Sequence, residues 1–272
     1  MNTRQDDHGG APVAFVTGAT GGIGEATCRA LAQAGATVVA GARNRVKAEA
    51  LCAELRELGG RAFAVRLDVV KGPDVQEAVG EALLKAGPIT WLVNNAGIAQ
   101  SCKLDAPDTP ALIRRLFEVN FFGAIRCFDA CLASMREAGG GQVVQIASSA
   151  ALRGYPYVSG YASTKHALLG WTRSAALELA REHVGVSAVC PHYVDSPMTA
   201  TSVQNIMDKT GRSSEETYAS LAQMNPGGRL VTCEEVALAV RDLLLGDRSG
   251  VVVELDGGEP RIVEEGVPFP PR

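Results

Sequence analysis

The stretch Val13-Ala-Phe-Val-Thr-Gly-Ala-Thr-Gly-Gly-Ile-Gly24 decides the fold of this chain of 272 residues. Its apolar start predicts a strand, its glycines predict a tight turn, and residues 25–34 predict a helix. Glycine lets a backbone approach a ligand closely, and the following helix start offers N–H groups to a pyrophosphate. The spacing of Gly18, Gly22 and Gly24 differs from the Gly-x-Gly-x-x-Gly fingerprint, and an ordinary glycine-rich turn is the alternative.

Strand-like runs alternate with helical patterns along the rest of the chain. We expect further strands at residues 37–41, 61–67, 90–94, 142–147, 185–190 and 251–255. Helical patterns between them include residues 46–58, which stop at two glycines, and the long segment 161–182. This alternation predicts an α/β fold of one domain, a doubly wound parallel sheet that binds ligands at the carboxyl ends of its strands.

Composition excludes several classes of function. Hydrophobic residues make up 46% of the chain and charged residues 21%, as in globular proteins, and the net charge of −4 argues against nucleic-acid binding. No apolar run is long enough to cross a membrane and the polar first ten residues lack a secretory core, so we expect a cytoplasmic protein. The seven cysteines have no metal or redox spacing, which predicts buried free thiols and no metal site.

Tyr161 and Lys165 stand four residues apart in Ser159-Gly-Tyr-Ala-Ser-Thr-Lys165, on one face of a predicted helix. A phenol has an ordinary pKa of about 10, and a neighbouring ammonium favours the phenolate and lowers that pKa. We therefore expect Tyr161 to exchange a proton near neutral pH. By itself the spacing is also compatible with a surface pair, so the other motifs decide between the two interpretations.

Three motifs occur in the order typical of short-chain dehydrogenases/reductases. Thr17-Gly-x-x-x-Gly-x-Gly24 is followed by Asn94-Asn95-Ala96-Gly97, which ends an apolar run, and then by Tyr161-x-x-x-Lys165. The chain resembles this family from about residue 13 to residue 258. The resemblance implies a Rossmann-type sheet, a nicotinamide cofactor and a position for Asn95 beside that cofactor.

The resemblance also implies a catalytic set of Asn120, Ser148, Tyr161 and Lys165. Ser148 ends a β-rich run thirteen residues before Tyr161, the spacing of the family serine that fixes a carbonyl oxygen, with Ser149 as the alternative. Without the family, Ser148 would be interpreted as a cap of the next turn. Asn120 matches the asparagine that supports a water near the lysine, and the alternative is that it only bonds to nearby backbone.

Cofactor choice depends on the end of the second strand. Ala42 occupies the position where a carboxylate would bind the ribose of NAD, and Arg43 follows with a cation suited to a 2′-phosphate, so NADP is favoured over NAD. By resemblance, Asp68 and Val69 meet the adenine, while Val194 and Ser196 meet the nicotinamide amide. The expected cofactor site comprises Gly18, Thr20, Gly22, Ile23, Gly24, Arg43, Asp68, Val69, Asn95, Tyr161, Lys165, Val194 and Ser196.

Four parts of the chain have no clear match in the family pattern. His192 stands where the family has glycine, either edging the substrate pocket or filling a turn. Residues 197–228 are long and mixed in polarity, which suggests a mobile lid over the substrate. Residues 1–12 are expected to be flexible, and the proline-containing extension 259–272 either to be disordered or to dock on a neighbouring subunit.

The function implied is hydride transfer between nicotinamide and a ketone or secondary alcohol, with Tyr161 exchanging the proton. Residues 41–44, 161–166 and 188–191 look like those of 3-oxoacyl and polyketide ketoreductases. An NAD-dependent alcohol, steroid or aromatic diol dehydrogenase remains the alternative, and a nucleotide-binding regulator without turnover is the alternative from another class. The resemblance further implies a homotetramer, or a homodimer, that acts on a small molecule.

Overall fold

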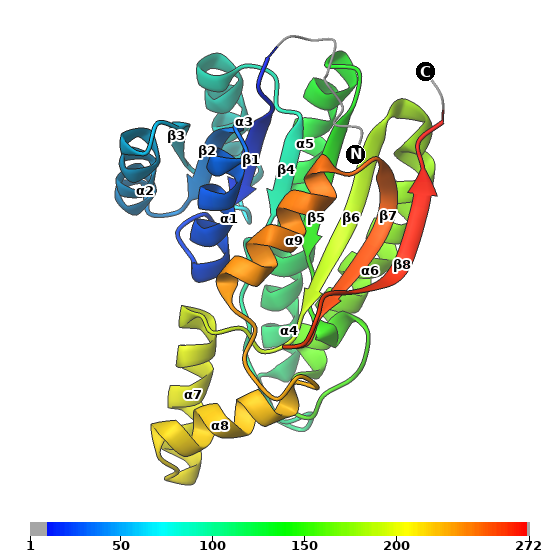
Figure 1. Cartoon of the computed structure of the whole chain (residues 1–272). Helices are drawn as coiled ribbons and strands as arrows, with labels where there is room; N and C mark the ends of the chain where they lie inside the picture. Colours follow the sequence, from blue (N-terminus) through cyan, green and yellow to red (C-terminus); the bar gives the residue numbers. More distant parts are fainter. Residues whose placement is uncertain (1–9, 271–272) are drawn as a thin grey trace.

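An eight-stranded sheet organises the computed structural model, which describes residues 10–270 (Figure 1). The strand order is β3-β2-β1-β4-β5-β6-β7-β8, in which neighbours are parallel except for the antiparallel pair β7 and β8. The strands are β1 (Val13–Thr17), β2 (Thr37–Ala42), β3 (Arg61–Arg66), β4 (Trp91–Asn94), β5 (Gly141–Ile146), β6 (Val184–Pro191), β7 (Arg248–Leu255) and β8 (Arg261–Pro268). The predicted α/β class and doubly wound parallel sheet are confirmed, and each expected strand lies within three residues of its observed bounds.

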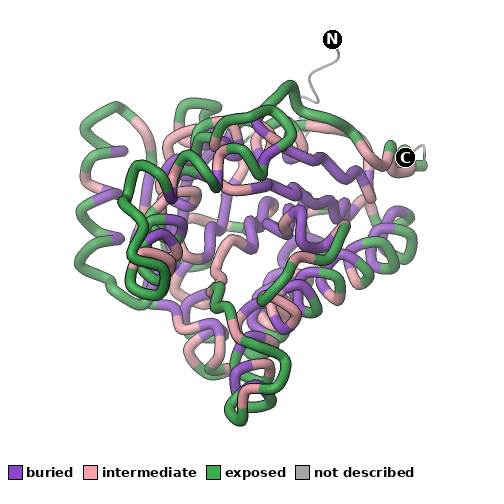
Figure 2. Tube along the Cα trace, turned by 90° about the horizontal axis from the view of Figure 1, so that it is seen from below, coloured by how far each residue is buried: buried purple, intermediate pink, exposed green. Residues whose placement is uncertain are grey.

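Helices cover both faces of this sheet, and the strands between them are buried (Figures 1 and 2). One face packs against α1, α2 and α9, and the other against α3, α5 and α6. These helices are α1 (Gly22–Gln33), α2 (Arg45–Glu57), α3 (Gly72–Ala86), α5 (Gly123–Glu137), α6 (Ser159–Leu179) and α9 (Cys233–Leu245). The predicted long helix 161–182 is α6 followed by a short turn, η3 (Ala180–Glu182).

Two further groups of helices lie near the carboxyl ends of the strands. Helix α4 (Thr109–Phe117) runs through a π-helical turn, η1 (Glu118–Phe122), directly into α5. Helices α7 (Pro197–Thr210) and α8 (Ser214–Met224) form a projection at the lower end of the view in Figure 1. Residues 197–228 are therefore mostly helical, with Val203 and Leu221 among the few buried apolar side chains.

The C-terminal extension contains an ordered strand, so the expectation that it is disordered is wrong, while its docking on a neighbouring subunit stays a prediction. Gly257 has φ +90° and begins the reversal that returns the chain along the edge of β7. Strand β8 then pairs with β7 of its own chain, from Glu254 with Arg261 to Arg248 with Pro268. The prolines exclude a helix, as predicted, but they stand at the two ends of an extended segment where a strand tolerates them.

Two expectations from composition can be compared with the described residues. All seven cysteines are free, six of them buried, while Cys102 is partly exposed. In the range 10–270, none of the helices combines the length and apolar character that crossing a bilayer requires. The expected flexible segment 1–12 lies almost entirely outside the described residues.

Candidate active site

The glycine turn is fastened to the end of β4. Asn95 donates from Nδ2 to the carbonyl oxygens of Thr17, at 3.1 Å, and Gly18, at 3.0 Å. The Thr17 hydroxyl in turn accepts the backbone N–H groups of Asn95 and Ala96, both at 3.0 Å. Gly18 has φ +63°, and a Cβ there would lie 2.9 Å from the Ala96 Cα. Asn95 therefore lies beside the turn and holds its shape, and its position beside the cofactor stays a prediction.

The start of α1 fits a dinucleotide pyrophosphate. The N-cap of this helix is Gly21, and no side chain caps it, so its first N–H groups remain available. The turn leaves no space for larger residues, because a Cβ on Gly24 would lie 2.3 Å from the Gly18 carbonyl oxygen. Thr20 and Ile23, also in the expected set, are partly buried, and Ile23 packs against the core below.

Arg43 is an exposed cation at the end of β2 without a protein partner among residues 10–270. Its neighbours differ, because Arg45 donates to Glu81 at 2.7 Å and Arg66 donates to Asp74 at 2.6 Å. Asn44 is also engaged, since its side chain caps α2. The Arg43 guanidinium is therefore available for a ligand phosphate.

Asp68 and Val69 follow β3 and shape the turn before α3. The Asp68 carboxylate accepts the Val70 N–H at 3.3 Å, while the N-cap of α3 is Lys71. The Val69 side chain is buried against α5, and a Cβ on Gly123 would lie 2.7 Å from its Cγ2. Val69 thus faces the core and its carbonyl oxygen accepts from the Arg126 Nη1 at 3.4 Å, and the contacts of Asp68 and Val69 with adenine stay predictions.

Lys165 and Tyr161 project from α6 toward the end of β5. The Lys165 side chain is buried, and its Nζ donates to the carbonyl oxygen of Ile146 at 2.7 Å. The same Nζ lies 5.7 Å from the centre of the Tyr161 ring. The sequence-predicted pair is therefore brought together at the carboxyl edge of the sheet.

The pKa of Tyr161 is raised, contrary to the expectation from its spacing to Lys165. Desolvation raises this pKa to about 12, and a hydrogen bond with Ser148 opposes the shift only in part. Burial likewise lowers the pKa of Lys165 to about 8. The expectation was wrong because it counted the attraction between the two groups and not the cost of withdrawing each charge from water.

Ser148 and Ser149 have different partners, which separates the two candidates. The Ser148 hydroxyl accepts the Ala150 N–H at 3.1 Å and is the serine that bonds to Tyr161. The buried Ser149 accepts a hydrogen bond from the Tyr155 hydroxyl at 3.0 Å. Ser148 is thus both the cap of the next turn and the neighbour of the Tyr161 phenol.

Asn120 lies in the π-helical turn η1 and connects three parts of the site. Its Oδ1 accepts the Ile98 N–H at 2.8 Å, and its Nδ2 donates to the Ile98 carbonyl at 2.9 Å and to the Thr164 hydroxyl at 3.2 Å. Thr164 immediately precedes Lys165, and π-helical turns often mark functional positions. Asn120 therefore does bond to backbone, but to the loop after β4 rather than to its own helix.

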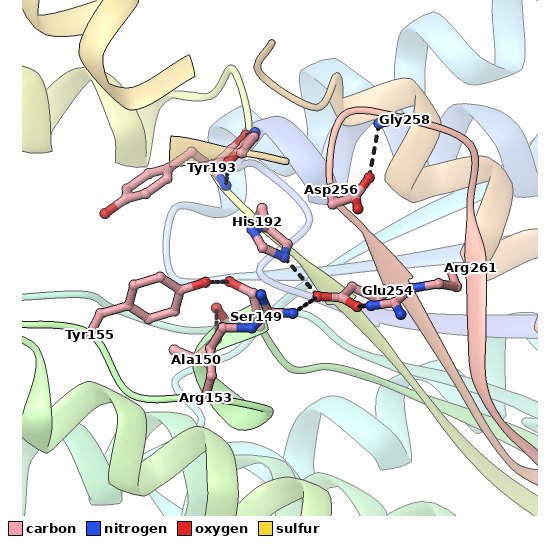
Figure 3. A network of polar contacts seen from close by, with 12 residues as sticks. Ser149, Ala150, Arg153, Tyr155, His192, Tyr193, Glu254, Asp256, Gly258 and Arg261 are labelled. Atoms are coloured by element: carbon pink, nitrogen blue, oxygen red, sulfur yellow. Dashed lines mark hydrogen bonds and ion pairs between the residues drawn. The ribbon is translucent and has the colours of Figure 1, made fainter. Parts of the chain in front are cut away.

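The segment after β6 carries the last expected cofactor residues. Val194 forms an isolated bridge with Val231, and the Ser196 hydroxyl caps α7 by accepting the Thr199 N–H at 3.3 Å. His192 is buried with its Nε2 2.8 Å from the Glu254 Oε1, so it is held inside the protein (Figure 3).

Two tyrosines near the catalytic group were missed in the sequence. Tyr193 is close enough to Tyr161 for their charges to interact, and Tyr155 interacts in the same way with Tyr193. Both lie next to residues singled out from the sequence. Tyr155 precedes Tyr161 by six residues, and Tyr193 directly follows His192, which stands where the family has glycine. Together they present aromatic rings near Tyr161.

Comparisons with known proteins agree with this geometry. The family model described as short chain dehydrogenase matches residues 12–207. The cis-4-hydroxycyclohexanecarboxylate dehydrogenase of Sinomonas cyclohexanicum is 36% identical over 250 residues, which are 90% of this chain and 95% of that protein. The 3-oxoacyl-(acyl-carrier-protein) reductase of Thermotoga maritima is 32% identical over 252 residues, 90% of this chain and 96% of that protein.

A solved structure agrees over nearly the same length. A variant of actinorhodin polyketide ketoreductase, solved with NADPH, superposes with a TM-score of 0.85 at 33% identity and covers 91% of this chain and 97% of its own. The chain belongs to the short-chain dehydrogenase/reductase family. It is an oxidoreductase of the class that interconverts ketones and alcohols with a nicotinamide cofactor.

Proposed function

We propose that the protein is an NADP(H)-dependent oxidoreductase that reduces a ketone to a secondary alcohol, with Tyr161 as the proton donor. The observation that carries this proposal is the convergence of Ser148, Tyr161 and buried Lys165 at the carboxyl end of β5. Because the pKa of Tyr161 is about 12, the phenol holds its proton at neutral pH, as donation to a carbonyl oxygen requires.

Each residue then has a defined task. When bound, the cofactor supplies or accepts the hydride, which is the step that no side chain can perform. Ser148 donates a hydrogen bond that fixes the substrate oxygen beside the Tyr161 hydroxyl. The Lys165 ammonium stabilises the phenolate left after proton donation, and Asn120 holds the loop after β4 and helix α6 in place around it.

The preference for NADP(H) is proposed from Arg43. Among residues 10–270 its guanidinium has no carboxylate partner, whereas the neighbouring Arg45 and Arg66 are already paired, so Arg43 is the cation proposed to bind a 2′-phosphate. The NADPH in the solved polyketide ketoreductase structure supports the same choice. The second candidate is an NAD-dependent alcohol, steroid or aromatic diol dehydrogenase, and the relative that acts on a hydroxycyclohexanecarboxylate favours keeping it.

The substrate is proposed to be a cyclic ketone or a 3-oxoacyl thioester. Tyr155 and Tyr193 offer aromatic surface beside Tyr161, and the relatives named above act on substrates of these two kinds. Helices α7 and α8 are proposed as the lid, since they project beyond the carboxyl ends of the strands. We further propose that the catalytic domain spans residues 13–258 and assembles as a homotetramer or homodimer in the cytoplasm.

The test is a matrix of initial rates with NADPH and NADH against cyclohexanone, 4-oxocyclohexanecarboxylate and acetoacetyl-coenzyme A. We expect turnover with NADPH and at least one of these ketones, and none in Tyr161→Phe. Turnover with NADH alone favours the dehydrogenase alternative. Cofactor binding without turnover of any ketone favours the non-catalytic regulator and contradicts the proposal.

A further inference from the structure

A buried carboxylate near the candidate active site accepts hydrogen bonds from three side chains, one histidine and two arginines. The Glu254 side chain near the end of β7 is 1% exposed. It accepts from the His192 Nε2 at 2.8 Å and from the guanidinium groups of Arg153 and Arg261 (Figure 3). The two arginines are far more exposed, at 44% and 62%, so each spans from the surface to the buried carboxylate.

The three partners come from three separate segments. Arg153 closes the turn that begins at the catalytic serine, and its N–H donates to the Ser149 carbonyl at 3.1 Å. His192 follows β6 and directly precedes Tyr193, and its own N–H donates to the Leu255 carbonyl at 2.8 Å. Arg261 is the first residue of β8. The Glu254 carboxylate therefore joins three segments: the turn of residues 148–153, which we call the serine turn, the segment of His192 and Tyr193 after β6, and strand β8.

The ionised state of the buried Glu254 carboxylate depends on all three of its partners. Burial alone raises the pKa of Glu254, but the hydrogen bonds from His192 and Arg261 and the charge of Arg153 together hold it below its usual value. Glu254 is therefore ionised at neutral pH, and an ionised buried carboxylate is costly unless it is paired and hydrogen-bonded. The segments that carry the partners are consequently held in one arrangement.

We propose that Glu254 is a positioning residue of this enzyme, which acts through Arg153 on the turn of Ser148 and Ser149 and through His192 on Tyr193. This role rests on the proposed functions of Ser148 and Tyr161. The chain of contacts is short: Arg153 binds back to Ser149, Ser149 receives the Tyr155 hydroxyl, and Ser148 bonds to Tyr161. Misplacement of a reacting group by about 1 Å lowers turnover by up to about a hundredfold, so small movements matter.

The chain contains a matched control for this role. Glu264 on β8 accepts from the Arg173 Nε at 3.0 Å, so it also pairs a carboxylate with an arginine and also fastens the C-terminal strand. Among residues 10–270 its hydrogen bonds go to Arg173 of α6 and none goes to the turn of Ser148 and Ser149. Glu264→Gln therefore repeats the chemical change of Glu254→Gln without releasing Arg153 or His192.

The experiment combines kinetics with limited proteolysis on the full chain. We expect Glu254→Gln and Arg153→Met each to lower kcat about tenfold with the Kd of NADPH unchanged, and the double variant to be no slower than either single variant. Arg153→Lys should recover part of kcat because it restores the charge. Trypsin should cut after Arg153 at least about fivefold faster in Glu254→Gln, with Glu264→Gln at the wild-type rate in both assays.

Three results would overturn the role of Glu254: wild-type kcat in Glu254→Gln, additive losses in the double variant, or equal losses in Glu264→Gln. Should Glu254→Gln fail to fold, Arg153→Met and Arg153→Lys decide by the same kinetic criteria. Tyr161→Phe is measured beside them with the ketone that turns over fastest. Retained turnover in that variant contradicts the proposed function, while the tryptic rates still test whether Glu254 holds the serine turn.

Discussion

The Lys165 Nζ lies 5.7 Å from the centre of the Tyr161 ring, one helical turn away. The ammonium is also directed at the carbonyl oxygen of Ile146, at 2.7 Å, which fixes it between α6 and the end of β5. Desolvation raises the pKa of the phenol to about 12 and lowers that of the ammonium to about 8. The pair is thus a protonated acid next to a cation that releases its own proton readily.

Tyr161→Phe removes the proton donor and leaves the ring in place. We expect kcat for ketone reduction to fall by a factor of about 10² to 10⁴, the usual contribution of a positioned acid. Binding of NADPH should remain within about twofold of the wild type, because the glycine turn and Arg43 are untouched. Steady-state rates and a fluorescence titration of NADPH measure the two effects, and a parallel loss of both would show that the variant is misfolded.

Lys165→Met gives a prediction for the pH dependence of stability. The pKa of Lys165 is about 8 in the folded chain and 10.5 ordinarily, so between these values the unfolded chain binds more protons and stability rises with pH. Lys165→Met lacks this dependence. The variant should therefore gain stability over the wild type at pH 7, by up to roughly 3 kcal/mol, and lose more than half of that gain as the pH approaches 9.5.

Urea unfolding of both chains at pH 7, 8 and 9.5 measures this difference. Working below pH 10 keeps the titration of Tyr161 out of the comparison, since its pKa is raised to about 12 in the folded chain. A stability difference that is constant over this range would contradict the burial of a charged Lys165.

Arg43→Leu tests the cofactor preference. A charge-assisted hydrogen bond to phosphate contributes about 1.5 to 3 kcal/mol, so the KM for NADPH should rise roughly tenfold to a hundredfold while that for NADH stays nearly constant. Arg45→Leu is the matched control, because Arg45 is already paired with Glu81 at 2.7 Å. Equal effects of the two substitutions, or a similar loss with both cofactors, would refute a specific role of Arg43.

Ser148→Ala and Ser149→Ala separate the two neighbouring serines. Ser148→Ala removes the group that bonds to Tyr161, and we expect kcat to fall by about 10². Ser149→Ala removes the acceptor of the Tyr155 hydroxyl at 3.0 Å and should change KM more than kcat. The two kcat and KM values, measured with the same ketone, decide the assignment, and the reverse pattern would exchange the roles of the serines.

Local sequence signals were sufficient for seven of the eight strands of the sheet, and strand β8 was missed. The glycine turn, the run ending at Asn94 and the pair Tyr161 and Lys165 are each compatible with another local structure, and only their order along the chain makes them specific. Parallel strands then bring their carboxyl ends to a common edge. That is why Asn95, Ser148 and Tyr161, far apart in the chain, lie where they were expected.

Properties that depend on distant parts of the chain could not be predicted in this way. The pKa of Tyr161 depends on how deeply the completed fold desolvates it, and no spacing reports that depth. The pairing of His192 with Glu254 joins residues 62 positions apart. The π-helical turn at Asn120 has no characteristic residue pattern by which the sequence could predict it. It is evident only in the folded chain, where Asn120 contacts Ile98 and Thr164.

Strand β8 also protects the sheet from pairing with other chains. An exposed β edge is a template for aggregation, and proteins suppress it with prolines, charges or short strands. Here the outermost strand begins after Pro260, ends at Pro268 and carries Glu264 and Glu265 in its middle. The reversal after Gly257 thus covers the regular edge of β7 with a strand that a further chain cannot readily extend, which favours solubility at high concentration.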